Sequence, residues 1–170
     1  MIYTLDYPNF EVKNAFLAHF AQLWTNKEAF NSYIHKLIQS LHGHDFESFF
    51  TILRSIFANI DYDLHIAQEK YYQTVFYLIF TLIGLRVSAE VKTNIGRIDA
   101  VIEDKDVFLF EFKFNGTKEE ALEQIRKHKY FEKYLAGGLK QSTAATRAEK
   151  IYLLGVEFKD KNVGDWTVSE

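Results

Sequence analysis

Two short stretches of alternating residues in the second half of the chain limit its fold more than any other feature. Residues 97–103 contain Asp99, and residues 107–114 contain Glu111 and Lys113. Side chains two positions apart on a strand share a face, so Glu111 and Lys113 point together, away from a face of phenylalanine. That opposite face consists of Phe108, Phe110, Phe112 and Phe114. The second stretch is therefore suited to burial in a sheet, and its acid and base are not ordinary core residues.

The length of the turn between the two stretches decides whether their acids meet. Residues 104–106, Asp-Lys-Asp, form a tight acidic turn, so the stretches are predicted to pair as a hairpin. If the turn uses only these three residues, Asp99 lies opposite Glu111 on one side of the sheet. A four-residue loop would place Asp99 opposite Phe110 instead. We predict the three-residue register, or a bulge that restores it.

An aspartate beside Glu111 would make a hard, oxygen-rich site suited to Mg²⁺ or Mn²⁺. Lys113 then lies where it can orient or activate a water, or stabilise developing negative charge. Taken singly, Asp99 is more often a solvated residue at a strand end, and Glu111 with Lys113 is more often a weak surface pair. Their combination within apolar strands favours a metal or catalytic role.

The composition fits one domain with a sizeable core and excludes several classes of protein. Of the 170 residues, 48% are hydrophobic and none is cysteine, which excludes disulfides and thiolate metal sites and agrees with a cytoplasmic protein. The N-terminus does not read as a signal peptide, and the most apolar stretch, residues 75–85, is too short to cross a bilayer. The net charge of −3 disfavours a general basic coat for nucleic acid, so such contact would use a local patch. The candidates are Arg126, Lys127, Lys129 and Lys133 on one helix, or Lys140 and Arg147 beyond it.

The hydrophobic periodicity predicts a helical first half followed by an α/β second half. The expected helices span residues 9–24, 26–43, 45–58, 64–82 and 118–135. The expected strands span residues 86–92, 97–103, 107–114 and 151–158, with a candidate edge strand at 166–168. The long step from the third strand to the fourth favours a parallel, right-handed crossover. We therefore expect a helical region over residues 1–64, packed on a core over residues 65–170 as one compact domain.

Several other residues are candidates for the site. Glu69 either points into the site or is an acid favoured by the helix N-terminus, and Glu90 is a similar candidate in the first strand. Gly96 allows a tight approach or a bend with positive φ. Arg97 shares the face of the aspartate and contacts either a phosphate or, as an ion pair, Glu90 or Glu111.

The helix after Lys113 carries a further candidate. Gln124 lies on a face that can reach back to the sheet. Packing explains Tyr130 and Tyr134, and His128 is more often a packing or surface residue than a base or ligand. The other histidines offer no third ligand at zinc spacing.

These residues together match a known pattern. Gly96-Arg97-Ile98-Asp99, eleven intervening residues and Glu111-Phe112-Lys113 resemble the PD-(D/E)xK nuclease superfamily, with Ile-Asp in place of Pro-Asp. The opening residues 7–12, the helix around Gln124 and the strand over 151–158 resemble a branch found in bacterial proteins with an AAA-ATPase-like N-terminal domain. The resemblance implies a nuclease-like domain of a longer protein, or a stand-alone relative. The chain itself has no nucleotide-binding loop and is not expected to hydrolyse ATP.

The resemblance also implies a fold, an activity and residue roles. The fold would be restriction-endonuclease-like, a mixed central sheet flanked by helices, and the activity a metal-dependent hydrolysis of phosphodiester bonds in DNA. Asp99 and Glu111 would bind Mg²⁺ (or Mn²⁺) together with the backbone carbonyl of Phe112. Lys113 would position the attacking water, and Glu69 matches a frequent acid on the helix before the sheet.

Gln124 is similar to the helix glutamine of related nucleases, although the next tyrosine, Tyr130, follows after six residues rather than four. This departure puts Tyr130 in doubt as a site residue.

Two other functions compete with hydrolysis of nucleic acid. The acidic balance of charge favours a binding or regulatory module that keeps the fold without turnover. An enzyme that uses Glu111 and Asp99 as an acid/base pair on a sugar is less natural, because Lys113 would hold both carboxylates ionised.

Overall fold

The computed structural model describes residues 27–60, 67–82, 85–93, 96–135 and 150–170. The helix expected over residues 9–24, the opening residues 7–12 and the basic residues Lys140 and Arg147 lie outside these ranges.

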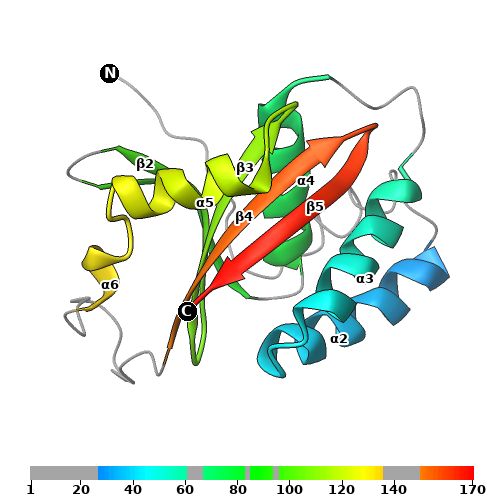
Figure 1. The fold of residues 1–170 in the computed structure, drawn as a ribbon. Helices are drawn as coiled ribbons and strands as arrows, with labels where there is room; N and C mark the ends of the chain where they lie inside the picture. Colours follow the sequence, from blue (N-terminus) through cyan, green and yellow to red (C-terminus); the bar gives the residue numbers. More distant parts are fainter. Residues whose placement is uncertain (1–26, 61–66, 83–84, 94–95, 136–149) are drawn as a thin grey trace, which may run out of the picture.

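A single mixed sheet organises the described chain (Figure 1). Its strands, in spatial order, are β1 (Arg86–Lys92), β2 (Arg97–Glu103), β3 (Val107–Phe114), β4 (Ile151–Lys159) and β5 (Asn162–Ser169). β3 and β4 are parallel and the other neighbours are antiparallel. The predicted hairpin, the parallel crossover and the mixed sheet are confirmed, and the predicted edge strand is present and longer than expected.

Helices cover both faces of this sheet. α2 (Lys27–His42), α3 (Phe46–Ala58) and α4 (Glu69–Leu82) contribute to a core on one face, while α5 (Lys118–Lys127) packs on the other (Figure 1). α3 begins where Asp45 accepts a hydrogen bond from the Ser48 N–H at 3.0 Å, as an N-cap does. The start of α4 differs from the prediction: residues 67–68 form a bend, and the helix begins at Glu69 rather than at residue 64.

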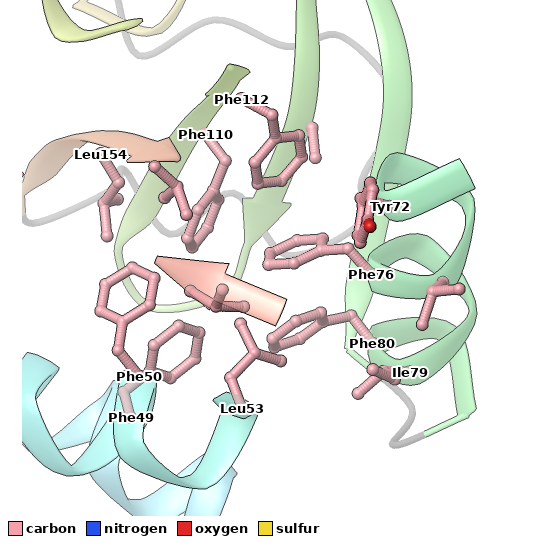
Figure 2. Packing of buried hydrophobic residues seen from close by; sticks show 14 of the residues in the cluster. Phe49, Phe50, Leu53, Tyr72, Phe76, Ile79, Phe80, Phe110, Phe112 and Leu154 are labelled. Atoms are coloured by element: carbon pink, nitrogen blue, oxygen red, sulfur yellow. The ribbon is translucent and has the colours of Figure 1, made fainter. Parts of the chain in front are cut away.

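The phenylalanine face of β3 lies at the centre of the larger core (Figure 2). The Phe110 ring centroid is 6.1 Å from that of Phe49 on α3 and 4.8 Å from that of Phe76 on α4. Phe108, Phe110 and Phe112 are buried, as predicted, whereas Phe114 at the end of the strand is half-buried. Burial of this face fixes which side of β3 carries Glu111 and Lys113.

The helix predicted over residues 118–135 is interrupted, and this prediction is wrong at its centre. α5 ends at Lys127, Lys129 has a left-handed φ of 49°, and α6 (Glu132–Leu135) is a separate short turn. In a continuous helix, Tyr130 would point about 140° away from Ile125, which faces the sheet. The left-handed residue turns the Tyr130 side chain back into the buried side of the layer, where it is only 2% exposed.

The hairpin between β2 and β3 has the predicted register. The pairs run from Glu103 with Val107 to Ala100 with Phe110, so the turn contains three residues. Hydrogen bonds fix the last residue of the turn, Asp106, which is buried. Its carboxylate accepts from His44 Nε2 at 2.8 Å and from the Lys150 N–H at 2.9 Å. The same register, continued by one pair, brings Asp99 level with Glu111.

A glycine on β4 lets α5 approach the sheet beside this level. Gly155 pairs with Glu111, and a Cβ at Gly155 would clash with the Lys118 carbonyl oxygen and lie 2.8 Å from the Leu122 nitrogen. Both of these are backbone atoms, so relief would require movement of the helix.

We therefore expect Gly155→Ala to lower the free energy of unfolding by about 1–3 kcal/mol. Urea denaturation measures this difference. Gly164→Ala on β5 is the matched control, because its Cβ would meet only the Glu157 side chain, at 2.8 Å, which can rotate. Equal stability of the Gly155→Ala chain and the wild type would contradict this packing.

Within the described residues, no helix has the length and apolar character needed to cross a membrane.

Candidate metal-binding and catalytic site

Four elements bring the predicted site residues together at one end of the sheet. β2 supplies Asp99, β3 supplies Glu111 and Lys113, α5 supplies Gln124 and α4 supplies Glu69 at its first residue. The phenylalanine core holds β3 and α4, and close contact with β4 holds α5. The site side chains therefore extend from packed elements.

Asp99 lies where the pairing of β2 with β3 stops. The pairing ends with Ala100 and Phe110, and two residues further along β3 the N–H of Phe112 donates to Asp99 Oδ2 at 2.8 Å. The carboxylate thus satisfies a backbone donor that the ladder leaves free. This contact ties Asp99 to the residue between Glu111 and Lys113.

Glu111 is the most deeply buried charged residue of the site, with 1% exposure. Its Oε1 accepts a hydrogen bond from Gln124 Nε2 and lies 3.9 Å from Lys113 Nζ. Its Oε2 is buried and has no hydrogen-bond partner among the described residues. An unpartnered buried carboxylate oxygen is costly unless something else completes it.

Gln124 bridges the acid and the base. Its Oε1 accepts a hydrogen bond from Lys113 Nζ at 2.6 Å while its Nε2 donates to Glu111. The amide therefore fixes the spacing of the two charged groups. The sequence predicts that Gln124 can reach the sheet, but not that it binds both Glu111 and Lys113.

Glu69 lies at the edge of the group. Its Oε2 accepts a hydrogen bond from the Phe114 N–H at 3.2 Å, which ties the start of α4 to the end of β3. Its negative charge also raises the pKa values of Asp99 and Glu111. Glu69 is thus an acid in the first turn of α4, as one of the two alternatives expected, and its role as a site residue stays a prediction.

The environment opposes ionisation of both central acids. Burial, with the charge of Glu69 as a lesser contribution, raises the pKa of Asp99 to about 6, although the hydrogen bond from Phe112 counteracts the shift. Burial and then the charge of Asp99 raise the pKa of Glu111 to about 8, with Lys113 acting in the opposite direction. A nearby positive charge would favour the ionised forms of both acids.

A divalent cation fits this donor set. No group of three or more His, Cys, Asp and Glu side chains is arranged for a metal within the described ranges, so the carboxylates of Asp99 and Glu111 would need a further oxygen ligand. The backbone carbonyl of Phe112, the residue after Glu111 on β3, can serve as that ligand. Hard oxygen donors, the orphaned Glu111 Oε2 and two acids with raised pKa values match the requirements of Mg²⁺ or Mn²⁺.

Glu90 and Arg97 lie beside this group rather than in it. Arg97 Nη1 is 3.5 Å from Glu90 Oε2, so the ion pair with Glu90 is the one that forms. Glu90 also pairs with Lys70 at 2.5 Å. Arg97 lowers the pKa of Asp99, so its charge acts on the site.

The contact that Tyr130 makes beside the site was not predicted from the sequence. Its hydroxyl accepts a hydrogen bond from the Arg97 N–H at 3.3 Å and is 3.0 Å from His128 Nδ1. A Cβ at Gly96 would lie 2.6 Å from this hydroxyl, so the glycine serves a tight approach, and its φ is outside the left-handed region. The glycine before the strand was the one local signal of this contact.

The predicted basic patch is divided between elements. Arg126 and Lys127 lie on α5, Lys129 in the interruption and Lys133 on α6. Arg126 donates to Ser169 Oγ at 2.9 Å, and Lys129 pairs with Glu132 at 3.5 Å.

Comparison with known proteins agrees with this arrangement. Residues 67–165 match a family described as PD-(D/E)XK nuclease superfamily. An "Uncharacterized protein in vnfD 5'region" of Azotobacter chroococcum mcd 1 is 36% identical over 165 residues, which cover 92% of this chain. The chain spans only 30% of that relative's length. No solved structure matches. Since the family match covers more than half of the chain, from α4 to β5, the chain belongs to the PD-(D/E)XK nuclease superfamily.

Proposed function

We propose that this chain hydrolyses phosphodiester bonds in DNA with the aid of a bound Mg²⁺ or Mn²⁺. The observation that carries the proposal is the buried carboxylate of Glu111, with one oxygen unpartnered, beside a second carboxylate whose pKa is also raised. Two acids in such a position destabilise the fold unless a cation or protons neutralise them. Membership of a nuclease superfamily supports phosphodiester chemistry at the same residues.

The proposed roles follow from the contacts. Asp99, Glu111 and the carbonyl of Phe112 would hold the cation, which would lower the pKa of a water and offset charge on the scissile phosphate. Lys113 orients the attacking water or stabilises the charge that develops on the phosphate. Gln124 positions both charged side chains through its two hydrogen bonds. Glu69 fixes the end of β3 and adds negative charge near the metal ligands.

A second candidate function is binding without turnover. The observation that favours it is the pairing of exposed cations with acids of the same chain, as in Lys129 with Glu132 and Lys150 with Glu170. Paired cations leave less free positive charge for a long nucleic acid. Binding that does not need a metal and survives Asp99→Ala would support this candidate.

We further propose that the chain works together with an ATPase-like domain in a longer protein. The relative from Azotobacter chroococcum supports a longer protein, because most of its length lies outside the matched part. The ATPase-like nature of the additional domain rests on the resemblance of the sequence alone. A full-length protein whose cleavage rate responds to ATP would support the proposal, and one that is indifferent to ATP would argue against it.

Incubation of the chain with supercoiled plasmid, linear duplex and RNA tests the principal proposal. We expect cleavage of the DNA substrates in millimolar Mg²⁺ or Mn²⁺ and none in EDTA, because without a cation the acids cannot bind a phosphate productively. Gel electrophoresis of each substrate over time measures this. Preferential cleavage of RNA would overturn the choice of DNA, and cleavage undiminished by EDTA would overturn the metal-dependent mechanism.

A further inference from the structure

A small charged cluster lies beside the site and is built from three different elements. Lys70 from α4 and Arg97 from β2 both contact Glu90 from β1, at 2.5 Å and 3.5 Å. The Lys70 and Arg97 side chains are 71% and 56% exposed. The trio thus presents two accessible cations held by one carboxylate, with a local charge of +1.

Two residues of this cluster are close in sequence to acids of the site. Arg97 is two residues before Asp99 on the same face of β2 and acts on its pKa. Lys70 follows Glu69, whose carboxylate binds the end of β3. Both cations therefore belong to elements that also supply acids of the site.

The backbone of Glu90 has a conformation that is unfavourable for glutamate. Its φ is 51°, in the left-handed region, within a strand. The ladder between β1 and β2 pairs Ala89 with Ala100 and Val91 with Ile98 but omits the pair of Glu90 with Asp99 between them. A non-glycine residue in this conformation costs of the order of 1–3 kcal/mol, and such strain clusters at functional sites. The strain directs Glu90 to the place where it meets both cations.

The backbone of Arg97 is fixed although its side chain is exposed. Tyr130 accepts a hydrogen bond from the Arg97 N–H at 3.3 Å, and the Gly96 N–H donates to Thr93 Oγ1 at 3.0 Å. The guanidinium therefore extends from an ordered base into solvent. This arrangement suits a group that meets a ligand better than one that only stabilises the fold.

We propose that Lys70 and Arg97 form a phosphate-binding pair that seats the nucleic-acid backbone next to Asp99, with Glu90 pairing with both cations when no nucleic acid is bound. This inference rests on the proposed function, because it assigns the contact for the substrate of the same site. Exposed ion pairs contribute little free energy, so exchange of Glu90 for a phosphate oxygen costs little. A guanidinium and an ammonium are the groups that most often bind phosphate.

Salt dependence of binding tests the pair without any need for turnover. Fluorescence anisotropy of a labelled duplex in EDTA, over about 50–200 mM salt, measures the slope of log affinity against log salt. The Lys70→Gln/Arg97→Gln chain is expected to lose about 1.8 units of this slope, since each phosphate contact contributes about 0.9. Arg97→Lys keeps the charge and is expected to keep most of the slope.

The matched control removes the same charge elsewhere. Lys36 is exposed on α2, and Lys150 lies before β4 at the end of β3 opposite to Lys113, with its ammonium 2.7 Å from Glu170. Lys36→Gln/Lys150→Gln is expected to keep the wild-type slope. Equal slopes for the two double variants, or no binding of duplex by the wild type in this range, would overturn the inference.

The same experiment separates the two proposals. If the pair carries the salt dependence but the wild type never cleaves in Mg²⁺, the proposed function fails and the phosphate-binding pair stands. If the wild type cleaves and the Lys70→Gln/Arg97→Gln chain shows the control slope and an unchanged KM, the pair fails and the proposed function stands.

Discussion

Lys113→Ala is expected to slow metal-dependent cleavage of DNA by about 100-fold or more, the usual effect of removing a group that assists the transition state. Lys113 donates a hydrogen bond to Gln124 and lies 3.9 Å from Glu111, so its ammonium is held beside the proposed metal ligands. The Lys113 side chain is 25% exposed, and water can replace it beside Gln124. The variant should therefore keep its fold.

Initial rates on plasmid DNA at saturating Mg²⁺ measure this loss, and circular dichroism checks the fold. Lys127→Ala is the matched control, because Lys127 is an exposed lysine at the end of α5, the helix that carries Gln124. A folded Lys113→Ala chain that cleaves at the wild-type rate would contradict the role of this lysine.

The stability of the metal-free chain is expected to fall as the pH rises from about 4 to 8. Burial raises the pKa of Glu111 from 4.5 to about 8 and that of Asp99 from 3.8 to about 6, so the native state keeps protons that the unfolded chain releases. A group whose pKa is raised on folding contributes stability below its unfolded pKa, and this contribution is lost as the pH rises through the folded value. Between pH 5 and pH 8 the expected loss is on the order of 4 kcal/mol for the pair.

Urea denaturation in EDTA at pH 5, 6, 7 and 8 measures this dependence. Mn²⁺ should restore stability strongly at pH 8 and weakly at pH 5, because only the ionised carboxylates bind it. Glu111→Gln keeps an oxygen that can accept from Gln124 and removes the buried charge, so it should flatten the pH dependence and abolish the effect of Mn²⁺. Stability that rises between pH 5 and pH 8 in EDTA would contradict the burial of these acids.

The hairpin that carries the site could be predicted closely from the sequence. The bounds of β2 and β3 and the three-residue turn follow from alternation and local turn residues, which are properties of neighbours in the chain. The shared face of Glu111 and Lys113 follows from the same alternation. The catalytic and metal-binding roles of these residues remain predictions.

The features that escaped prediction depend on contacts between distant residues. The interruption of the helix after Lys127 arises because Tyr130 binds the backbone of Arg97, a partner 33 positions earlier. Glu90 has no local reason to adopt a left-handed conformation, since it is neither glycine nor asparagine. The double contact of Gln124 likewise requires that α5 dock at the level of Gly155. The hydrophobic periodicity predicts the helices and strands, but these contacts depend on how the helices and strands pack against one another.

The central claim is that Asp99 and Glu111 together hold one divalent cation, and calorimetric titration with Mn²⁺ tests it most directly. At pH 7 we expect one Mn²⁺ per chain, with a heat that changes with the ionisation enthalpy of the buffer, because Glu111, with a pKa of about 8, must release a proton on binding. Asp99→Asn should abolish this binding. Absence of Mn²⁺ binding by the wild type, or equal binding by the folded Asp99→Asn chain, would contradict the claim.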